Sequence, residues 1–168
     1  MTRLVLVSDT HLPKRAKDLP APLWAAIEAA DIVIHAGDWV DTATVDAVAR
    51  RSRRLIAVRG NNDGPAFEDR LPLVARVTVE GLRFAVVHET GAATGREPRM
   101  RAAFPDADVL VFGHSHIPWD TTSADGALRL LNPGSPTDRR RQPDFTWMTA
   151  VVDDSALDVT LVRLPPSR

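Results

Sequence analysis

Aspartate, asparagine and histidine side chains recur along the chain in an order that would suit metal ions. The series begins with Asp9 and His11, ends with His114 and His116, and contains four of the five histidines. Its members in chain order are Asp9, His11, Asp38, Asn61, His88, His114 and His116. Carboxylate oxygen and imidazole nitrogen bind manganese, iron or zinc, and thiolate ligands are excluded because the sequence has no cysteine. The series therefore predicts a metal centre.

Two pairs in the series, Asp9 with His11 and His114 with His116, have one residue between their members. Side chains at positions i and i+2 of extended chain point to the same side, so each pair can bind one ion. Either pair alone more often belongs to a solvated loop than to a metal site. The prediction of a binuclear centre depends on the whole series, because its members follow five predicted strands in a histidine-poor chain.

A glycine directly precedes three of the candidate ligands. These pairs are Gly37-Asp38, Gly60-Asn61 and Gly113-His114. Each pair follows a short apolar run that predicts a buried strand. Loops beyond the carboxyl ends of strands form the ligand crevice of α/β sheets, so separate strands would deliver these side chains to one place. Glycine there lets the backbone approach a bound ion or phosphate without a clash from a Cβ atom.

The elements that must position these side chains alternate between strand and helix in the first half of the chain. The predicted strands are residues 4–7, 32–34 and 55–58, and the predicted helices are residues 23–30 and 42–51. Asp41 or Thr42 is suited to cap the second helix, and Pro22 stands near the start of the first. This alternation predicts a parallel sheet with helical crossovers.

The second half of the chain is rich in strands. The predicted strands are residues 74–79, 82–87, 109–112, 119–122, 128–131, 147–152 and 157–162. A β-hairpin turn is predicted at Glu80-Gly81, a helix over residues 98–104, and further hairpin turns at residues 125–126 and 153–155. Two packed sheets flanked by helices fit this pattern better than one open sheet.

Length and charge restrict the class of protein. The 168 residues suit one domain, and no apolar stretch approaches the roughly 18 residues of a membrane span, so a cytoplasmic protein without a membrane partner is expected. The net charge of −1 argues against a nucleic-acid partner, which would favour a basic surplus.

Taken in order, the motifs resemble those of the calcineurin-like metallophosphoesterase superfamily: Asp-x-His, Gly-Asp, Gly-Asn, His and Gly-His-x-His. The compact chain and its segments 35–38 and 132–135 are similar to the small phosphodiesterases of the YfcE type, to which Vps29 is related. The resemblance implies an α/β fold, a four-layer α/β/β/α sandwich of two mixed β-sheets flanked by helices. It would form a single metallophosphoesterase domain over residues 1–168.

The resemblance also implies two divalent metal ions, with manganese preferred and iron, zinc or nickel as alternatives. The first ion would take Asp9, His11, Asp38 and His116, and the second would take Asp38, Asn61, His88 and His114. Catalytic roles fall to Asp38, Asn61 and His88, and substrate contacts to Asn61 and Asn62. Two dications, two carboxylates and a bridging hydroxide leave a charge of about +1, which would attract a phosphate.

The implied reaction is hydrolysis of a small phosphate ester by a hydroxide that bridges two metal ions, with phosphodiesters favoured over monoesters. The alternative is a Vps29-like protein-interaction module with little or no activity. The complete ligand series favours the enzyme. Whether the chain forms a homo-oligomer is left open.

Asn62 departs from the superfamily pattern, and the neighbouring Asp63 has two possible roles. Asn62 stands where many members have a histidine that assists the leaving group, and an amide cannot act as a general acid. Asp63 would donate a proton only if its pKa were raised, and it is otherwise predicted to be a solvated turn residue.

Four other features are predicted to lie outside the metal ligands. His35 is predicted to be a buried histidine that orients a neighbouring ligand or loop. Glu89, where the family commonly has glycine, is predicted to face solvent rather than the second ion. The segment 132–135 is predicted to support the site, and the arginines at 139–141 to form a solvated surface rather than to steer substrates.

Overall fold

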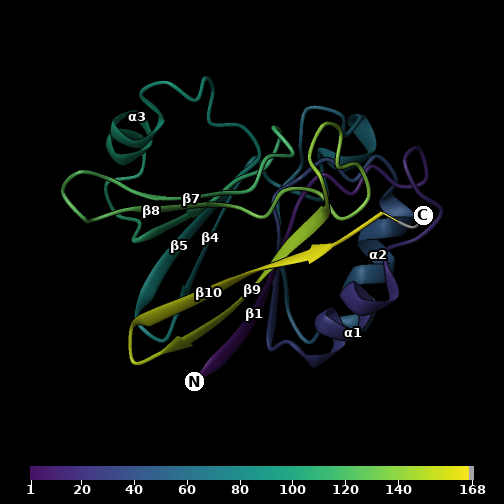
Figure 1. Cartoon of the computed structure of the whole chain (residues 1–168), viewed down its shortest axis with the longest axis horizontal. Helices are drawn as coiled ribbons and strands as arrows, with labels where there is room; N and C mark the ends of the chain where they lie inside the picture. The colour runs from purple at the N-terminus through teal and green to yellow at the C-terminus, as the bar shows by residue number, and fades with distance from the viewer. Residues whose placement is uncertain (167–168) are drawn as a thin grey trace.

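The computed structural model describes residues 1–166, which form two five-stranded β-sheets with helices on their outer sides (Figure 1). The helices are α1 (Ala21–Ala29), α2 (Thr42–Arg51) and α3 (Arg96–Ala103), with a short 3-10 turn η1 (Pro65–Phe67). Helices α1 and α2 cover one sheet, and α3 covers the other. None of the helices within residues 1–166 is both long and apolar enough to cross a membrane.

The first sheet has the strand order β10-β9-β1-β2-β3. Its strands are β1 (Thr2–Val7), β2 (Ile32–His35), β3 (Leu55–Ala57), β9 (Phe145–Asp153) and β10 (Ala156–Leu164). Strands β1, β2 and β3 are parallel, as the sequence alternation predicts, and β9 pairs with β1 in the antiparallel sense. The carboxyl ends of β1, β2 and β3 therefore lie at the same edge.

The second sheet has the order β4-β5-β6-β8-β7. Its strands are β4 (Val74–Val79), β5 (Leu82–Val87), β6 (Val109–Val111), β7 (Trp119–Thr122) and β8 (Arg129–Asn132). Strands β5, β6 and β8 are parallel, while β4 and β7 are antiparallel edge strands. Both sheets are mixed, and the predicted hairpin at Glu80-Gly81 joins β4 to β5.

Alternation along the strands explains why the apolar runs are continuous. On β1, Leu4 and Leu6 belong to the core between the two sheets, whereas Val5 and Val7 belong to the core under α1 and α2. On β5, Phe84 joins the core between the sheets, and its neighbours on either side in the strand face α3 or solvent. A strand covered on both faces needs apolar side chains at successive positions. The three apolar cores, under α1 and α2, between the sheets and under α3, separate the four layers of the predicted sandwich.

One helix starts where the sequence predicted, and another starts two residues earlier. Asp41 caps α2, its side chain accepting a hydrogen bond from the Ala43 N–H at 3.0 Å, as predicted. Helix α3 begins at Arg96, before the predicted start at Pro98, because Gly95 takes the left-handed conformation at φ 67° and serves as the N-cap. Proline is tolerated in a first helical turn, where the amide would have no intrahelical partner.

Candidate metal centre

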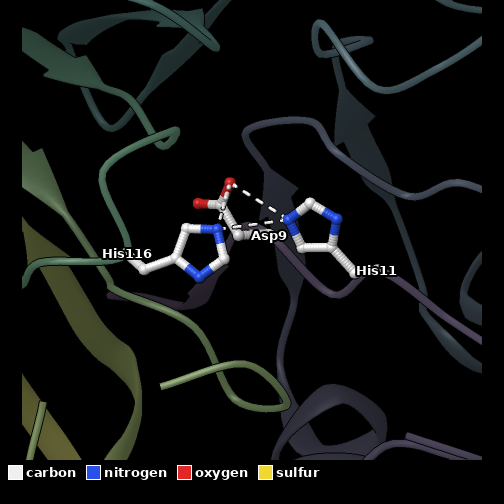
Figure 2. Close-up of side chains that lie close together, drawn as sticks. All are labelled: Asp9, His11 and His116. Atoms are coloured by element: carbon white, nitrogen blue, oxygen red, sulfur yellow. Dashed lines mark hydrogen bonds and ion pairs between the residues drawn. The ribbon is translucent and has the colours of Figure 1, made fainter. Parts of the chain in front are cut away.

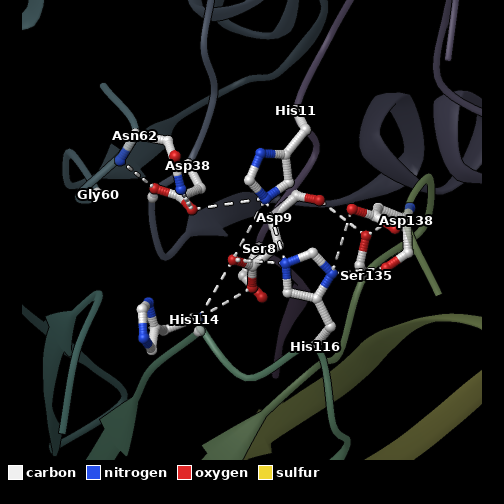
Figure 3. Close-up of polar contacts among 12 residues, drawn as sticks. Ser8, Asp9, His11, Asp38, Gly60, Asn62, His114, His116, Ser135 and Asp138 are labelled. Atoms are coloured by element: carbon white, nitrogen blue, oxygen red, sulfur yellow. Dashed lines mark hydrogen bonds and ion pairs between the residues drawn. The ribbon is translucent and has the colours of Figure 1, made fainter. Parts of the chain in front are cut away.

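All seven candidate ligands lie just beyond strand ends from both sheets, and their donor atoms come together in one place. Figure 3 shows Asp9, His11, Asp38, His114 and His116 of this series. Asp9 and His11 follow β1, Asp38 follows β2, Asn61 follows β3, His88 follows β5, and His114 and His116 follow β6. Their donor atoms form two adjoining sets. The first donor group is Asp9, His11, Asp38 and His116, and the second donor group is Asp38, Asn61, His88 and His114.

In the first donor group, three donor atoms converge at short range (Figure 2). His11 Nε2 and His116 Nε2 are 3.2 Å apart, and Asp9 Oδ1 lies 3.5 Å from His116 Nε2 and 3.9 Å from His11 Nε2. Asp38 Oδ2 completes the group at 3.5 Å from His11 Nε2. Atoms that share one ion through bonds of about 2.1 Å are separated by such distances.

The second donor group is equally close. Asn61 Oδ1 lies 2.9 Å from His88 Nε2 and 3.0 Å from His114 Nδ1, and Asp38 Oδ1 lies 3.3 Å from His88 Nε2. The two oxygens of Asp38 therefore face different donor groups. This arrangement supports the bridging role that the resemblance implies for this carboxylate.

Backbone carbonyls fix the orientation of two imidazoles. His88 Nδ1 lies 2.8 Å from the Ala36 carbonyl oxygen, and His116 Nδ1 lies 2.5 Å from the Asp138 carbonyl oxygen. A carbonyl oxygen can only accept, so Nδ1 must donate in both rings. In the neutral ring the lone pair then belongs to Nε2, which faces the other donors, as in metal-binding histidines.

The two carboxylates of the site have opposite electrostatic surroundings. Burial raises the pKa of Asp9 to about 7, since the side chain is fully removed from solvent. For Asp38, burial acts upward, but the hydrogen bond and charge of His88 and the donors of Asn62 outweigh it and hold the pKa well below its usual range. A divalent cation would compensate the buried charge of Asp9, so this donor set fits such an ion.

The histidines divide in the same way. Burial lowers the pKa of His116 to about 4 and also lowers that of His11, so both rings are neutral at pH 7 and available as ligands. Burial also acts to lower the pKa of His88, yet the hydrogen bond that His88 donates to Asp38 and the charges of Asp9 and Asp38 raise it to about 8. Metal binding at the second donor group must therefore displace a proton from His88.

Most of the candidate ligands have an unusual backbone conformation. Positive φ angles occur at Asp9 (55°), His11 (43°), Asp38 (63°), His114 (71°) and His116 (59°). This left-handed region is costly for residues other than glycine and persists where surrounding contacts enforce it. Here the Asp9 N–H donates to the Gly37 carbonyl at 2.9 Å, and the His11 N–H donates to the Asp38 carbonyl at 3.0 Å. The two loops hold each other in the conformation that aims their side chains inward.

Glycine is required at two positions because the ligand carboxylates pack directly against the backbone. A Cβ atom at Gly60 would lie 2.1 Å from Asp38 Oδ1, and one at Gly113 would lie 2.8 Å from Asp9 Oδ2. Both separations are shorter than carbon and oxygen tolerate. The close approach predicted from the sequence is thus an approach to the carboxylates themselves.

Replacing Gly60 with alanine is expected to weaken metal binding by at least about tenfold, because the new methyl group would push Asp38 out of both donor groups. Calorimetric titration of metal-free protein with Mn²⁺ would measure the change. Gly64→Ala is the matched control, since a Cβ atom there would meet nothing within 4 Å among the described residues. Equal Mn²⁺ affinity in the two variants would contradict this role for Gly60.

Asp63 is not the solvated turn residue predicted from the sequence; that interpretation was wrong. Its side chain is buried and accepts hydrogen bonds from the N–H groups of Asp38 at 3.0 Å, Trp39 at 2.8 Å, Val40 at 2.7 Å and Gly60 at 2.7 Å. It therefore ties the loop after β2 to the loop after β3. Burial raises the pKa of Asp63, and its backbone donors oppose that rise. Asp63 acts by positioning Asp38.

Asn62 holds the side-chain carboxylate of Asp38, whereas Asp63 holds the backbone of the same residue. Its backbone N–H donates to Asp38 Oδ1 at 2.9 Å, and its side-chain Nδ2 donates to Asp38 Oδ2 at 2.6 Å. The residue is otherwise exposed, beside the second donor group. The predicted substrate contact stays a prediction, and the orienting of Asp38 is a role that the sequence did not indicate.

The end of β8 and the segment that follows it support the ligand loops after β1 and β6. Asn132 Nδ2 donates to the Gly113 carbonyl at 2.9 Å, Ser135 Oγ donates to the Asp9 carbonyl at 2.7 Å, and Thr137 Oγ1 donates to the Thr10 carbonyl at 2.6 Å. These contacts agree with the supporting role predicted for residues 132–135. Thr137 was missed, because a threonine three residues beyond a Pro-Gly turn carries no local signal.

Three further residues or segments lie around the ligands. His35 is buried, stacks on Trp39 with ring centroids 3.4 Å apart, and accepts from the Gly37 N–H at 3.2 Å, in line with its predicted orienting role. Glu89 is half exposed, with its Oε1 3.8 Å from His114 Nδ1, so it borders the second donor group as well as solvent. Residues 139–141 line a hollow of about 180 Å³ beside His116.

Comparisons with known proteins agree with this geometry. Residues 2–155 match the calcineurin-like phosphoesterase superfamily domain. A probable metallophosphoesterase of Methanocaldococcus jannaschii is 32% identical over 135 residues, covering 79% of this chain and 67% of that protein. A Thermotoga maritima protein solved by NMR in solution is 32% identical, with a TM-score of 0.77 and coverage of 98% and 100%. Zinc-bound Vps29 of Entamoeba histolytica shares the fold at 20% identity and a TM-score of 0.77, covering 97% and 98%.

The matched region contains every candidate ligand, from Asp9 to His116. The superfamily resemblance drawn from the motifs is confirmed, and so is the sandwich of two mixed sheets flanked by helices. This chain belongs to the calcineurin-like phosphoesterase superfamily.

Proposed function

We propose that the protein is a phosphodiesterase that hydrolyses a small phosphate ester with two divalent metal ions, manganese being preferred. The observation that carries the proposal is the position of Asp38, whose two oxygens face two donor groups at 3.5 Å and 3.3 Å. Divalent ions in such a pair would supply Lewis acidity and a water of lowered pKa. The chain supplies the ligands, the neutral imidazoles and the buried carboxylates that hold them.

The proposed residue roles follow from the contacts. Asp38, Asn61 and His88 would hold the ions against the phosphate, while Asn62 keeps the carboxylate of Asp38 in place through two donated hydrogen bonds. Asn62 also lies at the exposed rim of the site, where its amide could contact a phosphate oxygen. Because an amide cannot protonate a leaving group, substrates whose leaving groups are weak bases are favoured.

A phosphodiester is favoured over a monoester on charge. A diester carries one negative charge at neutral pH, whereas a monoester carries up to two. Glu89 places a half-exposed carboxylate 3.8 Å from His114, at the border of the second donor group. This carboxylate would repel the additional charge of a monoester more than it repels a diester.

The proposal is tested by removing metal and restoring it. We expect a chelator to abolish hydrolysis of bis(4-nitrophenyl) phosphate. Adding Mn²⁺ should then raise the hydrolysis rate at least about a hundredfold above that of the metal-free protein, with about two ions bound per chain. Zinc, iron and nickel in parallel would rank the ions, and 4-nitrophenyl phosphate would measure the monoester rate. Hydrolysis of neither ester with any of these metals would instead favour a protein-interaction module related to Vps29.

A further inference from the structure

A hollow of about 380 Å³ opens directly beside the second donor group. Its wall comes from the loop after β3, the start of β4 and the end of β5, and it shares Asn61 and His88 with the second donor group. This volume lies within the range of small-molecule sites, about 300 to 1,000 Å³. A larger hollow of about 820 Å³ over α3 and β7 includes none of the candidate ligands. A group held in the smaller hollow would therefore lie next to a phosphate at the metal centre.

One side of the hollow is an exposed apolar wall. Leu73 is 62% exposed and Val74 is 43% exposed, and both line the hollow together with Val87. Leu73 immediately precedes the edge strand β4, and Val74 is its first residue. Farther along the same strand, Val77 and Val79 pack into the core between the sheets. Adjacent exposed apolar side chains beside polar catalytic groups are typical of a ligand site.

The hollow is also lined by Arg59, which carries a guanidinium group. Arg59 Nη1 lies 3.3 Å from Glu68 Oε1, but its buried Nε has no hydrogen-bond partner among residues 1–166. The Arg59 backbone N–H donates to the Pro72 carbonyl at 3.0 Å, which fixes this residue against the chain entering β4. A planar guanidinium can stack on a ring through its face, which needs no hydrogen bond from the buried Nε.

The charges around the hollow do not favour an anionic occupant. Arg59 is already paired with Glu68, and the half-exposed Glu89 adds a carboxylate to the lining. The cationic residues 139–141 lie instead in a different hollow, beside His116 of the first donor group. A neutral group with apolar faces suits the hollow beside the second donor group better than a second phosphate does.

We propose that the hollow lined by Arg59, Leu73, Val74 and Glu89 binds the ester group that stays on the phosphate during hydrolysis, and that this group is an uncharged aromatic or heteroaromatic ring. The inference rests on the proposed phosphodiesterase function. If an oxygen held between the two ions attacked in line, the leaving group would depart from the opposite face of the phosphorus. A hollow that shares ligands with the ions lies beside them, where the retained group belongs.

The test compares two diesters that have the same leaving group and differ in the retained group, bis(4-nitrophenyl) phosphate and methyl 4-nitrophenyl phosphate. The ratio of their kcat/KM values, measured with Mn²⁺, reports recognition of the retained ring. We expect Leu73→Ser to lower this ratio about tenfold while the rate with the methyl ester changes little. The intrinsic difference in reactivity between the esters is the same for every variant, so it cancels.

Ile117→Ser is the matched control, because Ile117 is also an exposed apolar residue, at 46%, and lies on the side of His116. It should leave the ratio unchanged. If Leu73→Ser leaves the ratio unchanged while both esters are hydrolysed, the hollow has another occupant, such as a protein segment. That outcome overturns the inference and leaves the proposed function standing. If the wild-type protein hydrolyses neither ester, the proposed function fails and the inference fails with it. Circular dichroism would establish that the variants are folded.

Discussion

Replacing Asp38 with alanine should lower metal-dependent phosphodiester hydrolysis by about a thousandfold or more. This carboxylate lies 3.5 Å from His11 Nε2 through one oxygen and 3.3 Å from His88 Nε2 through the other. The substitution removes one ligand from each donor group, so metal content and activity should fall together. Steady-state kinetics with bis(4-nitrophenyl) phosphate would measure activity, and elemental analysis would measure the ions bound per chain.

Asp69→Ala is a suitable control for Asp38→Ala, because Asp69 is exposed and lies outside both donor groups. It should keep full activity and full metal content. The Asp38 variant should stay folded, since Asp63 would still accept hydrogen bonds from the backbone of the same loop. An Asp38→Ala protein that retains two ions and wild-type kcat/KM would show that this side chain does not bridge a metal pair.

Replacing Asp9 with asparagine should stabilise the metal-free protein at alkaline pH, although it removes a candidate ligand. Burial raises the pKa of Asp9 to about 7, above its ordinary value of 3.8. A carboxyl whose pKa is raised by folding contributes stability that is fully present below pH 4 and is lost as the pH rises through 7. The full loss amounts to something on the order of 4 kcal/mol. An asparagine at this position is neutral at every pH, so the variant does not lose this stability as the pH rises.

The measurement is the free energy of unfolding in urea with a chelator present, at about pH 4 and about pH 8. The difference between Asp9→Asn and wild type should move in favour of the variant by about 3 kcal/mol between these pH values. Asp69→Asn, an exposed carboxyl, should show almost no such change. With Mn²⁺ added the order should reverse, because only the wild type keeps its first donor group. If the difference in unfolding free energy between the variant and the wild type did not change with pH, burial would not raise the pKa of Asp9.

The sequence predicted the ligands because each stands directly after an apolar run. Strand ends in parallel sheets share one edge, so Asp38 after β2 and Asn61 after β3 had to lie near each other. The apolar runs also predicted both sheets, since strands buried on two faces leave an unbroken apolar pattern. Local pattern and tertiary position coincide for these residues.

Other parts of the site could not be predicted because their roles arise only across the fold. Asp63 belongs to a segment, Gly60 to Asp63, that has the composition of an ordinary turn, yet its carboxylate is turned inward to four N–H groups, three of them from the loop after β2. The left-handed backbone at His114 and His116 could not be predicted either, because only a small fraction of histidines adopt it and no local pattern marks which ones. Contacts such as those of Asp63 join residues far apart in sequence and leave no periodic signal.

Each donor group takes side chains from both sheets. In the first donor group, Asp9 and His11 follow β1 of the first sheet, and His116 follows β6 of the second sheet. A bound ion would therefore act as a cross-link between the two sheets, in addition to their apolar packing and to polar contacts such as the one from the Arg129 guanidinium to the Leu157 carbonyl at 3.0 Å. Separating the sheets would require releasing the ion, and at a metal concentration a hundredfold above its dissociation constant each site adds about 2.7 kcal/mol to that step. Metal supply would thus set how long the folded chain survives proteolysis.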